Sequence, residues 1–402
     1  MFENKSIIIG ISGGIAAYKT AYLVSALSKT AADVNVIMTK NACEFVKPIV
    51  FETLTGNKCY VDTFDRNFKF DVEHISLAKK ADLFLVAPAT ANVIAKFAHG
   101  IADDMLTTTF LASKCPKIIA PAMNTAMYEN QITVDNIALL KKYGIDVIKP
   151  ESGYLACGDT GAGKMPEPEF LYDYVEKYIA REKDLQGKKV LVTAGATMEA
   201  LDPVRFLTNH SSGKMGFAIA KEAILRGAEV TLIKAHTTAK LPSFVNVIEV
   251  SGAEEMFRQV TAVSEMQDII IKAAAVADYT PLNYVDHKIK KSDGELSIPL
   301  KRTPDILKYL GEHKKDNQFI CGFSMETENM LENSRAKLIK KNVDMIVANN
   351  LKDAGSGFGT DTNAVTFISR TSDKSLAIQS KNDVAKAIFD EIISRMQLVQ
   401  IS

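Results

Sequence analysis

Two stretches of the sequence and one histidine carry side chains that could bind a polar ligand or transfer a proton. The first, PAMNTAMY, covers Pro121–Tyr128 and holds Asn124, whose amide can both donate and accept a hydrogen bond. The second, LACGDTGAGKM, covers Leu155–Met165 and holds Cys157 in a glycine-rich setting that suits a flap over a site. His74, in EHIS, carries an imidazole that can accept a proton near neutral pH. Taken alone, Asn124 could equally form an Asx turn, and His74 could be structural.

Two glycine-containing segments are candidate phosphate sites. Gly10–Gly14 (GISGG) follows an apolar run and opens a helical pattern, so its backbone and a helix N-terminus could face an anion. It also fits the G-x-S-x-G elbow of α/β-hydrolases, but only nine residues precede it, too few for the strands of that fold. Ser211–Gly216 (SSGKMG) is similar to the end of a P-loop, but Thr208 replaces the first glycine and Met215 replaces Ser or Thr. A turn without a ligand remains the alternative for Gly10–Gly14, and a different phosphate site remains open for Ser211–Gly216.

Composition excludes several classes of function. The 402 residues include 48 Lys+Arg and 48 Asp+Glu, so no net charge attracts nucleic acid or an anionic membrane. Five scattered Cys without a CxxC pair argue against a zinc site and a disulfide framework, and fit a reducing cytoplasm. We interpret Cys43, Cys59, Cys115 and Cys321 as buried, unreactive packing residues. No apolar stretch is long enough for a signal peptide or a membrane span, so we expect a soluble chain.

Short apolar runs alternate with amphipathic stretches, which predicts an α/β class with parallel sheets covered on both faces. In the first half we expect helices at Ile15–Lys29 and Asp135–Tyr143 and strands at Ser6–Ile9, Val34–Met38, Asp82–Ala87, Lys117–Ala120 and Asp146–Ile148. After a Gly- and Pro-rich segment and a charged helix at Phe170–Gln186, the alternation restarts at Val190–Ala194. Later strands are expected at Glu229–Ile233, Asn246–Val250, Asp268–Lys272, Phe319–Cys321 and Asp344–Ala348, with a hairpin from Ala364–Ile368 and Leu376–Gln379. A chain of this length predicts two domains, here 1–187 and 188–402.

The first domain resembles the flavin-binding cysteine decarboxylase family. The motifs that carry this resemblance are SGGIAAYK from Ser12, APATAN from Ala87, ADD from Ala102 and PAMNTAM from Pro121. The resemblance implies a Rossmann-like or flavodoxin-like three-layer fold with FMN at the ends of the parallel strands. The implied FMN contacts are Ser12, Gly13, Thr39, Pro88, Ala89, Thr90, Asn92 and Met123. It also implies trimers, or multiples of trimers, with the FMN site at a subunit interface.

The same resemblance gives roles to three side chains. His74 would take the proton of a substrate thiol, and Asn124 would orient the carboxylate that leaves as CO2. Cys157 would return a proton at the end of the reaction, under a flap at about 151–168. FMN explains how an amino thiol can lose CO2, since transient oxidation of the C–S centre provides an electron sink. The family usually has Arg and Trp where Lys164 and Tyr128 stand, which puts the contact made by Lys164 in doubt because Lys lacks a bidentate fork.

Residues 188–402 resemble the phosphopantothenate–cysteine ligase domain that follows this decarboxylase in bacterial fusions. The matching segments are TAGAT from Thr193, DPVR from Asp202, NHSSGKMG from Asn209, Ala273–Asp278, KIKK from Lys288 and Gly322-Phe323. The resemblance implies that CTP, with Mg2+, activates 4′-phosphopantothenate as an acyl-cytidylate, which the cysteine amine then attacks. Mg2+ would be held mainly through the nucleotide, with Asp278 as a possible ligand.

The ligase resemblance also supplies site residues. Asn209 and Arg205 would hold the pantothenate side and the acyl intermediate, and Lys288 would balance triphosphate charge. The implied nucleotide contacts are Lys272, Ala273, Ala274, Asp278, Lys288, Pro304, Asp305, Ile306, Leu307, Phe323, Lys337 and Lys341. Without the resemblance, Lys288–Lys291 would be interpreted as a solvated loop. Lys337 and Lys341 are four residues apart on an expected helix, so they share a face, where an anion would offset their repulsion.

Together the two resemblances predict consecutive steps of coenzyme A biosynthesis on one chain, the C-terminal domain making what the N-terminal domain consumes. They imply a cytoplasmic homo-oligomer, with trimeric decarboxylase and dimeric ligase contacts that would build a dodecamer. One alternative is a non-catalytic flavin-binding regulatory protein of the same family. Another is an NAD(P) oxidoreductase, against which the missing G-x-G-x-x-G fingerprint counts.

Overall fold

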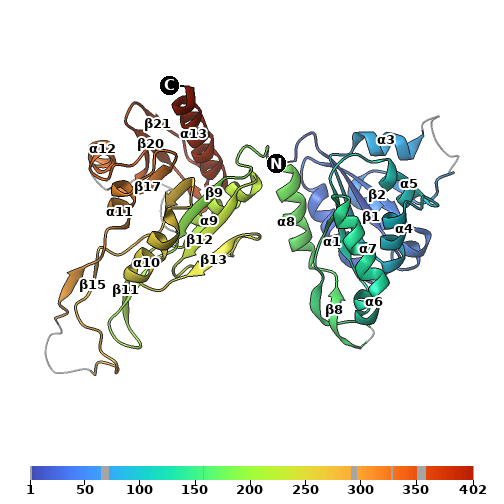
Figure 1. Cartoon of the computed structure of the whole chain (residues 1–402), viewed down its shortest axis with the longest axis horizontal. Coiled ribbons are helices and arrows are strands. Elements are labelled where there is room, and N and C mark those ends of the chain that lie inside the picture. Colours follow the sequence, from blue (N-terminus) through green and yellow to red (C-terminus); the bar gives the residue numbers. More distant parts are fainter. Residues whose placement is uncertain are drawn as a thin grey trace. The chain divides into compact units, whose positions relative to one another are not determined.

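The computed structural model describes residues 2–64, 72–156, 158–290, 297–326, 329–350 and 359–401. Cys157 and Lys291 lie outside this described part. The chain divides into two compact units, Met1–Arg181 and Glu182–Ser402, and each is described below by itself (Figure 1). Both are of the predicted α/β class, which is confirmed. Among the described residues, no helix combines the length and apolar character needed to cross a membrane.

The first unit is built on a six-stranded parallel sheet with the order β3-β2-β1-β4-β5-β6. Its strands are β1 Ser6–Ile11, β2 Asp33–Met38, β3 Cys59–Tyr60, β4 Leu83–Ala89, β5 Lys117–Pro121 and β6 Asp146–Val147. The helices are α1 Ala17–Ser28, α2 Pro48–Thr55, α3 Glu73–Lys80, α4 Ala91–His99, α5 Met105–Ala112, α6 Thr125–Glu129, α7 Gln131–Lys142 and α8 Pro168–Ile179, with a 3-10 turn, η1, at Lys40–Glu44. The five strands predicted in this half are all present, with small shifts at their ends.

Continuous apolar strands explain why this sheet is buried. Every residue of β1 and of β4 is buried, as expected for a parallel sheet covered on both faces. The helix expected at Asp135–Tyr143 begins earlier, at Gln131, because the side chain of Asn130 caps it by accepting from the Ile132 N–H. The single helix expected over Phe170–Gln186 is wrong in its second half. It ends at Ile179, and the Leu185 N–H donates instead to the carbonyl of Arg226.

The glycine-rich segment after β6 forms a hairpin of β7 Glu151–Tyr154 and β8 Thr160–Lys164. Lys164 Nζ lies 3.0 Å from Glu167 Oε1 and 3.5 Å from Glu151 Oε2. Lys19 of α1 reaches the same Glu167 oxygen at 2.8 Å. The hydrogen bond to Glu167 raises the pKa of Lys164, so this lysine is held in an ion-pair network at the base of the hairpin.

The second unit is built on an eight-stranded sheet with the order β13-β12-β9-β14-β17-β18-β20-β21, in which β20 and β21 run antiparallel to their neighbours. These strands are β9 Lys189–Ala194, β12 Glu229–Lys234, β13 Asn246–Glu249, β14 Ile269–Lys272, β17 Phe319–Glu326, β18 Met345–Asn350, β20 Val365–Ser369 and β21 Asp373–Ser375. The helices are α9 Lys214–Leu225, α10 Ala253–Ser264, α11 Ile306–Glu312, α12 Met330–Lys340 and α13 Lys381–Ile401. The expected hairpin is present, but its second strand lies at Asp373–Ser375 rather than Leu376–Gln379.

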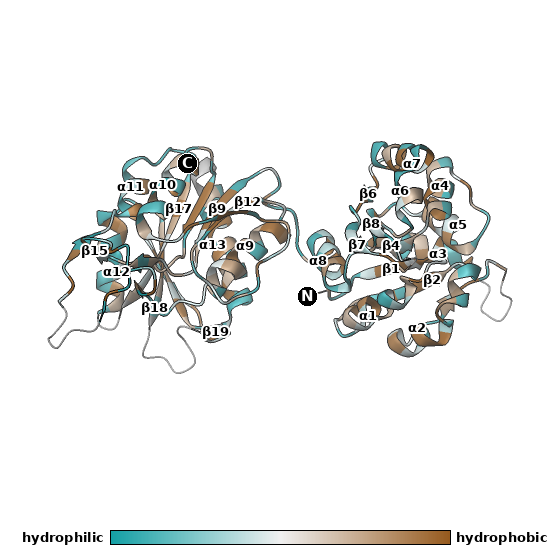
Figure 2. Ribbon diagram, turned by 90° about the horizontal axis from the view of Figure 1, so that it is seen from below, coloured by the Kyte–Doolittle hydropathy of each residue, from teal (hydrophilic) through white to brown (hydrophobic). Residues whose placement is uncertain are grey.

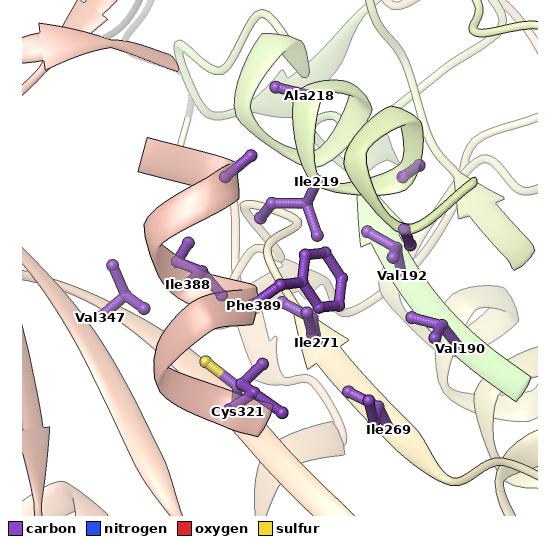
Figure 3. Close-up of a cluster of buried hydrophobic side chains, with 14 of the residues drawn as sticks. Val190, Val192, Ala218, Ile219, Ile269, Ile271, Cys321, Val347, Ile388 and Phe389 are labelled. Atoms are coloured by element: carbon purple, nitrogen blue, oxygen red, sulfur yellow. The ribbon is translucent and has the colours of Figure 1, made fainter. Parts of the chain in front are cut away.

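Two separate cores cover the two faces of this sheet. On one face, α9 and α13 pack Ile219 and Phe389 over Val192 and Ile271 (Figure 3). On the other face, α10, α11 and α12 pack over a second cluster that includes Leu338. Figure 2 shows the hydrophobic colour on strands such as β9 and β17, while the helices carry both hydrophobic and hydrophilic residues. The side chains at the carboxyl edge of this sheet therefore come from α9 and α13 on one face and from α10, α11 and α12 on the other.

Three small ribbons complete the second unit. Antiparallel pairs form between β10 Met198–Ala200 and β11 Phe206–Thr208, and between β15 Tyr279–Pro281 and β16 Leu300–Arg302. A third pair joins β19 Thr362–Asn363 to β22 Gln379–Ser380. The first two ribbons extend from loops that follow β9 and β14, at the carboxyl edge of the sheet.

Arg226 after α9 is buried, at 4% exposure, and joins three carboxylates. Its guanidinium lies 3.0 Å from Glu222 Oε1 and 3.1 Å from Asp184 Oδ2, and it also pairs with Asp390 of α13. We expect Arg226→Met to lower the free energy of unfolding of this unit by about 3–5 kcal/mol, because it leaves the buried carboxylate of Glu222 without its cation. The matched Arg258→Met, whose side chain is 72% exposed, should change it by less than about 0.5 kcal/mol. Calorimetry of the full chain measures both, and equal destabilisation by the two variants would contradict this role.

Candidate functional sites in the two units

The first unit contains a cavity of about 350 Å³ at the carboxyl ends of β1, β4 and β5. It is lined by Gly13, Gly14, Ile15, Ala16, Thr90, Ala122, Met123, Asn124, Met127, Leu155 and Ala156. Its size is within the range of about 300–1,000 Å³ usual for small-molecule sites. The predicted flavin contacts Gly13, Thr90 and Met123 therefore share one cavity with Asn124.

Ser12 supports one wall of this cavity. Its hydroxyl donates to the Pro88 carbonyl at 2.8 Å and accepts from the Thr90 N–H at 2.9 Å. Thr90 in turn caps α4 through its own hydroxyl. Gly13 packs so closely that an added Cβ would come within 2.5 Å of the Asn41 side chain. The loop after β1 and the loop after β4 are thus fixed against each other.

The opposite wall comes from the β7–β8 hairpin. The Met123 N–H donates to the Gly163 carbonyl at 3.0 Å, and Gly163 has φ +129° with no room for a side chain beside the Met123 carbonyl. Gly161 packs on Thr125, where an added Cβ would come within 2.4 Å of the hydroxyl oxygen. The glycines of the GAG sequence therefore allow the hairpin to approach the loop that carries Asn124.

Asn124 caps the short helix α6. Its side-chain oxygen accepts from the Met127 N–H at 3.2 Å, and its Nδ2 donates to Asp159 Oδ2 at 3.2 Å. The amide is therefore oriented by a helix end on one side and by the hairpin on the other. The side chain of Asn124 therefore both caps a helix and lines the cavity, so the two interpretations of this residue are compatible.

Other predicted residues of this unit do not line the cavity. Thr39 caps η1 beside Asn41, Asn92 is exposed on α4, and His74 is half-buried near the start of α3. Cys157 lies outside the described residues. Of the four cysteines interpreted as buried packing, Cys59 and Cys321 are buried, and burial raises the pKa of Cys59 to about 12. Cys43 and Cys115 are only half-buried, which corrects that interpretation, although burial also raises their pKa.

The second unit has a cavity of about 470 Å³ at the carboxyl edge of its sheet. It is lined by Asn209, Ser211, Ser212, Gly213, Lys214, Met215, Gly216, Lys272, Ala273, Ala274, Ala275, Val276, Asp278, Phe323, Ser324, Met325, Lys337, Asn349, Asn363 and Lys381. Seven predicted positions are therefore gathered in one place: Asn209, Lys272, Ala273, Ala274, Asp278, Phe323 and Lys337. The side chain of Asn209 reaches across to the Ala275 carbonyl at 3.3 Å.

Lys272, at the end of β14, has the most perturbed amine of this cavity. Burial first, and then the charge of Lys337, lower the pKa of Lys272 to about 8 against the opposing effect of Asp278. The Lys337 amine donates to the Phe323 carbonyl at 3.1 Å. Two cations this close repel each other, and a bound anion such as a nucleotide phosphate would reduce that repulsion further than Asp278 does.

A neighbouring ion pair joins two more predicted residues. Lys341 pairs with Asp305, whose other oxygen caps α11 by accepting from the Lys308 N–H. Burial acts to raise the pKa of Asp305, but the hydrogen bonds from Lys341 and the Lys308 N–H, together with the nearby lysine charges, outweigh it and lower the pKa. The side chains of Ile306 and Leu307 belong to the core, so any ligand contact of these two would go through their backbone. Pro304, Asp305, Ile306, Leu307 and Lys341 do not line the cavity.

Arg205 and Lys288 are exposed and also lie outside the cavity lining, yet one buried carboxylate links their loops. Asp202 accepts from the N–H groups of Val204 at 2.8 Å, Arg205 at 2.7 Å and Ile289 at 3.1 Å. Burial acts to raise the pKa of Asp202, but these backbone donors outweigh it and lower the pKa. Asp202 is a positioning residue that the sequence motif contained but did not single out.

Sequence reasoning also missed Asn349, Asn363 and Lys381, all of which line the second cavity. They are far apart in the sequence and belong to no motif, so only the fold brings them together with Lys214. In the part of the chain that the structure describes, no three His, Cys, Asp or Glu side chains are grouped to hold a metal ion.

Family models match both units. Residues 1–180 match the flavoprotein family, and residues 185–396 match the DNA/pantothenate metabolism flavoprotein C-terminal domain. The chain is 48% identical over 396 residues to the coenzyme A biosynthesis bifunctional protein CoaBC of Bacillus subtilis (strain 168), covering 98% of this chain and 97% of that protein. The protein of the same name in Escherichia coli (strain K12) is 40% identical, covering 98% and 97%.

Two solved structures resemble separate parts of the chain. A crystal structure of the C-terminal domain of CoaBC is 41% identical and covers 54% of this chain and 99% of that one, with a TM-score of 0.47. A PPC decarboxylase mutant complexed with pantothenoylaminoethenethiol is 30% identical and covers 44% and 99%, with a TM-score of 0.41.

The fold and the matched families define a flavoprotein domain joined to a second Rossmann-like domain of pantothenate metabolism. The full-length identities then fix the particular family. The chain belongs to the bifunctional coenzyme A biosynthesis proteins, with a decarboxylase domain followed by a ligase domain. The catalytic interpretation is favoured over the regulatory alternative.

Proposed function

We propose that the C-terminal domain couples 4′-phosphopantothenate to cysteine at the expense of CTP, and that the N-terminal domain decarboxylates the product to 4′-phosphopantetheine. The observation that supports this most is the assembly of predicted residues from distant motifs into one cavity per domain, each at the carboxyl edge of a sheet. On this proposal the protein acts in the cytoplasm, and its binding partners are the small molecules 4′-phosphopantothenate, cysteine and CTP.

The residues of the first cavity fit FMN. A glycine loop before the twelve-residue helix α1 suits a phosphate, and apolar Met123, Met127 and Leu155 suit a flavin ring. Bound FMN supplies a reversible two-electron acceptor, so the thiol substrate can lose CO2 with no net oxidation. The flavin contacts proposed from the sequence remain Ser12, Gly13, Thr39, Pro88, Ala89, Thr90, Asn92 and Met123.

Within this site Asn124 orients the substrate carboxylate, His74 takes the thiol proton and Cys157 returns a proton to the carbon that loses CO2. His74 does not line the cavity of its own chain. A site shared between copies, as the proposed trimer requires, would allow the His74 of another copy to reach it. Dimeric contacts between ligase domains would then extend the trimers to a dodecamer.

In the ligase domain, Lys272, Lys337 and Lys341 would neutralise the nucleotide phosphates, and Asp278 would meet the ribose or Mg2+. Lys288 stands on a loop tied to Asp202, from which its exposed side chain could approach the triphosphate. Asn209 and Arg205 would hold the acyl-cytidylate. Cysteine then forms the amide bond and releases CMP, after pyrophosphate has left in the activation step.

Two variants should separate the activities. We expect Lys288→Gln to reduce ligation by at least about 100-fold, because it removes a charge that stabilises the transferring phosphate, and to leave decarboxylation of supplied 4′-phosphopantothenoylcysteine intact. His74→Asn should do the reverse, through loss of a general base. Chromatography of both products, with CTP and ATP compared in the presence of Mg2+, measures this. Ligation that persists in Lys288→Gln would contradict the nucleotide assignment.

A further inference from the structure

The second cavity has a polar end that none of the proposed contacts uses. It is formed by Lys214, Asn349, Asn363 and Lys381, here called the α9–α13 polar cluster. Lys214 begins α9 and Lys381 begins α13, the two helices that cover one face of the sheet. The nucleotide positions on α11 and α12 belong to the opposite face. The cluster is therefore available to the other substrate of the ligation.

Its two lysines both contact one short segment of chain, residues 359–361. Lys214 Nζ lies 2.7 Å from Asp361 Oδ1 and 3.0 Å from the Gly359 carbonyl. The Lys381 amine donates to the Thr360 carbonyl, and its own N–H donates to the Asp361 carbonyl at 3.0 Å. Asp361 is 88% exposed while Lys381 is 8% exposed, so the cluster keeps a buried positive charge beside the cavity. Burial first, and then the charge of Lys214, lower the pKa of Lys381 against the opposing effect of Asp361.

Asn363 provides an independent sign of a ligand. It is 3% exposed and lines the cavity, and its Nδ2 donates to Asn349 Oδ1 at 3.3 Å. Its Oδ1 is buried and has no hydrogen-bond partner among the described residues. A buried polar atom without a partner costs roughly 1–3 kcal/mol, so its retention beside a cavity indicates a group that binds there.

We infer that the α9–α13 polar cluster binds the phosphomonoester end of the acid substrate, with Lys214 and Lys381 on the phosphate and Asn363 on the neighbouring hydroxyl. The inference rests on the proposed function and specifies where its acid substrate is anchored. A phosphate dianion offsets the two lysines and forms charge-assisted hydrogen bonds with them. The N-terminus of the twelve-residue helix α9 adds a favourable dipole at the same place. The hydroxyl beside the phosphate in 4′-phosphopantothenate supplies the donor that Asn363 Oδ1 lacks.

This anchoring makes the cluster a determinant of substrate specificity. The phosphate takes no part in amide formation, so binding it affects which acid is selected. An enzyme with this anchor discriminates against unphosphorylated pantothenate, since the charge-assisted hydrogen bonds from the two lysines to the phosphate are then not made. The acid would extend from the α9 face toward the nucleotide positions, which places its carboxylate end near Asn209.

The test measures ligation by the full-length protein with Lys381→Met and, separately, Lys214→Met. Each should raise KM for 4′-phosphopantothenate at least about tenfold, which is about 1.4 kcal/mol, with KM for CTP and cysteine changed less than about twofold. The wild-type preference for 4′-phosphopantothenate over pantothenate should fall by the same factor. Lys386→Met, on the exposed side of α13, is the matched control and should change none of these constants.

Two outcomes would overturn the inference. One is a rise of KM for CTP as large as that for the acid, which would assign the lysines to nucleotide phosphates. The other is an unchanged KM for the acid in folded variants. Lys214 is 35% exposed, so Lys214→Met decides the question if Lys381→Met does not fold. If the wild-type protein itself forms no 4′-phosphopantothenoylcysteine, the proposed function fails and the anchor fails with it. Normal wild-type turnover with unaffected variants removes the anchor alone.

Discussion

Asn124→Asp is expected to reduce decarboxylation of 4′-phosphopantothenoylcysteine by at least about 100-fold while ligation continues at the wild-type rate. The substitution keeps the size of the side chain and the oxygen that caps α6 by accepting from the Met127 N–H. It replaces the Nδ2 donor, which now lies 3.2 Å from Asp159 Oδ2, by a carboxylate oxygen. The variant should therefore fold normally but lose most of its decarboxylase activity.

Like charges explain the size of this effect. A carboxylate at position 124 would face Asp159 on one side and the substrate carboxylate on the other. Both interactions are repulsive, and the repulsion is stronger in a cavity from which part of the water is excluded. The loss should appear mainly in kcat/KM, because the carboxylate must be oriented before CO2 can leave. Raising the proton concentration should partly restore activity as the new carboxyl becomes neutral.

Asn130→Asp is the matched control for this prediction. Asn130 caps the next helix, α7, through its side-chain oxygen, which accepts from the Ile132 N–H, but it does not line the cavity. Both variants should keep the unfolding temperature within a few degrees of the wild type, since a cap with Asp is about as favourable as one with Asn. Measuring CO2 release and unfolding temperature for both is sufficient. Equal activity of Asn124→Asp and Asn130→Asp would remove Asn124 from the site.

Lys272→Met is expected to raise KM for the nucleotide by at least about tenfold and to remove a pH dependence from ligation. The pKa of Lys272 is about 8 in the free protein, so its charge is lost as pH rises through that value. Anionic phosphates bind the protonated amine, hence kcat/KM for the nucleotide should fall above about pH 8. The bound nucleotide raises the pKa again, so kcat should hold to higher pH.

The same shift has a consequence for stability. An unfolded lysine keeps its proton up to about pH 10.4, whereas folded Lys272 releases it near 8. Between these values the unfolded state binds more protons, so this group makes the free energy of unfolding rise with pH. Lys272→Met should remove that contribution. Lys234→Met, at the end of β12 in the same sheet and paired with Glu249, is the control and should leave the pH profile unchanged. An inflection near pH 8 that survives in Lys272→Met would contradict the assignment.

Much of the architecture could be predicted because buried parallel strands consist mainly of consecutive Ile, Val and Leu residues. Ser6–Ile9 contains three consecutive Ile, Val34–Met38 is apolar except for Asn35, and both lie in strands of the first sheet. The ribbons β10–β11 and β15–β16 could not be predicted, since their strands are three residues long and largely exposed. The end of α8 was misplaced because the charged residues after Ile179 continue a helical pattern, while tertiary contacts direct that segment elsewhere.

In the two candidate sites, too, some residues could be predicted from the sequence and others could not. Gly13, Thr90 and Asn124 share a cavity, as their family motifs indicated, because all three follow strands of one parallel sheet. Lys381 and Asn363 could not be found from sequence, since a buried lysine at a helix start and an asparagine in a two-residue strand resemble ordinary surface residues. The roles given to His74 and Cys157 remain predictions, and the variants described above address His74.

The central claim is that both reactions occur in sequence on one chain. Its most direct test is the release of labelled CO2 from cysteine carrying the label in its carboxyl carbon, with purified protein, 4′-phosphopantothenate, Mg2+ and CTP. We predict labelled CO2 and 4′-phosphopantetheine in equal amounts, with formation of both abolished when CTP or 4′-phosphopantothenate is omitted. Release of CO2 without nucleotide, or accumulation of 4′-phosphopantothenoylcysteine without CO2 by the flavin-loaded protein, would contradict it.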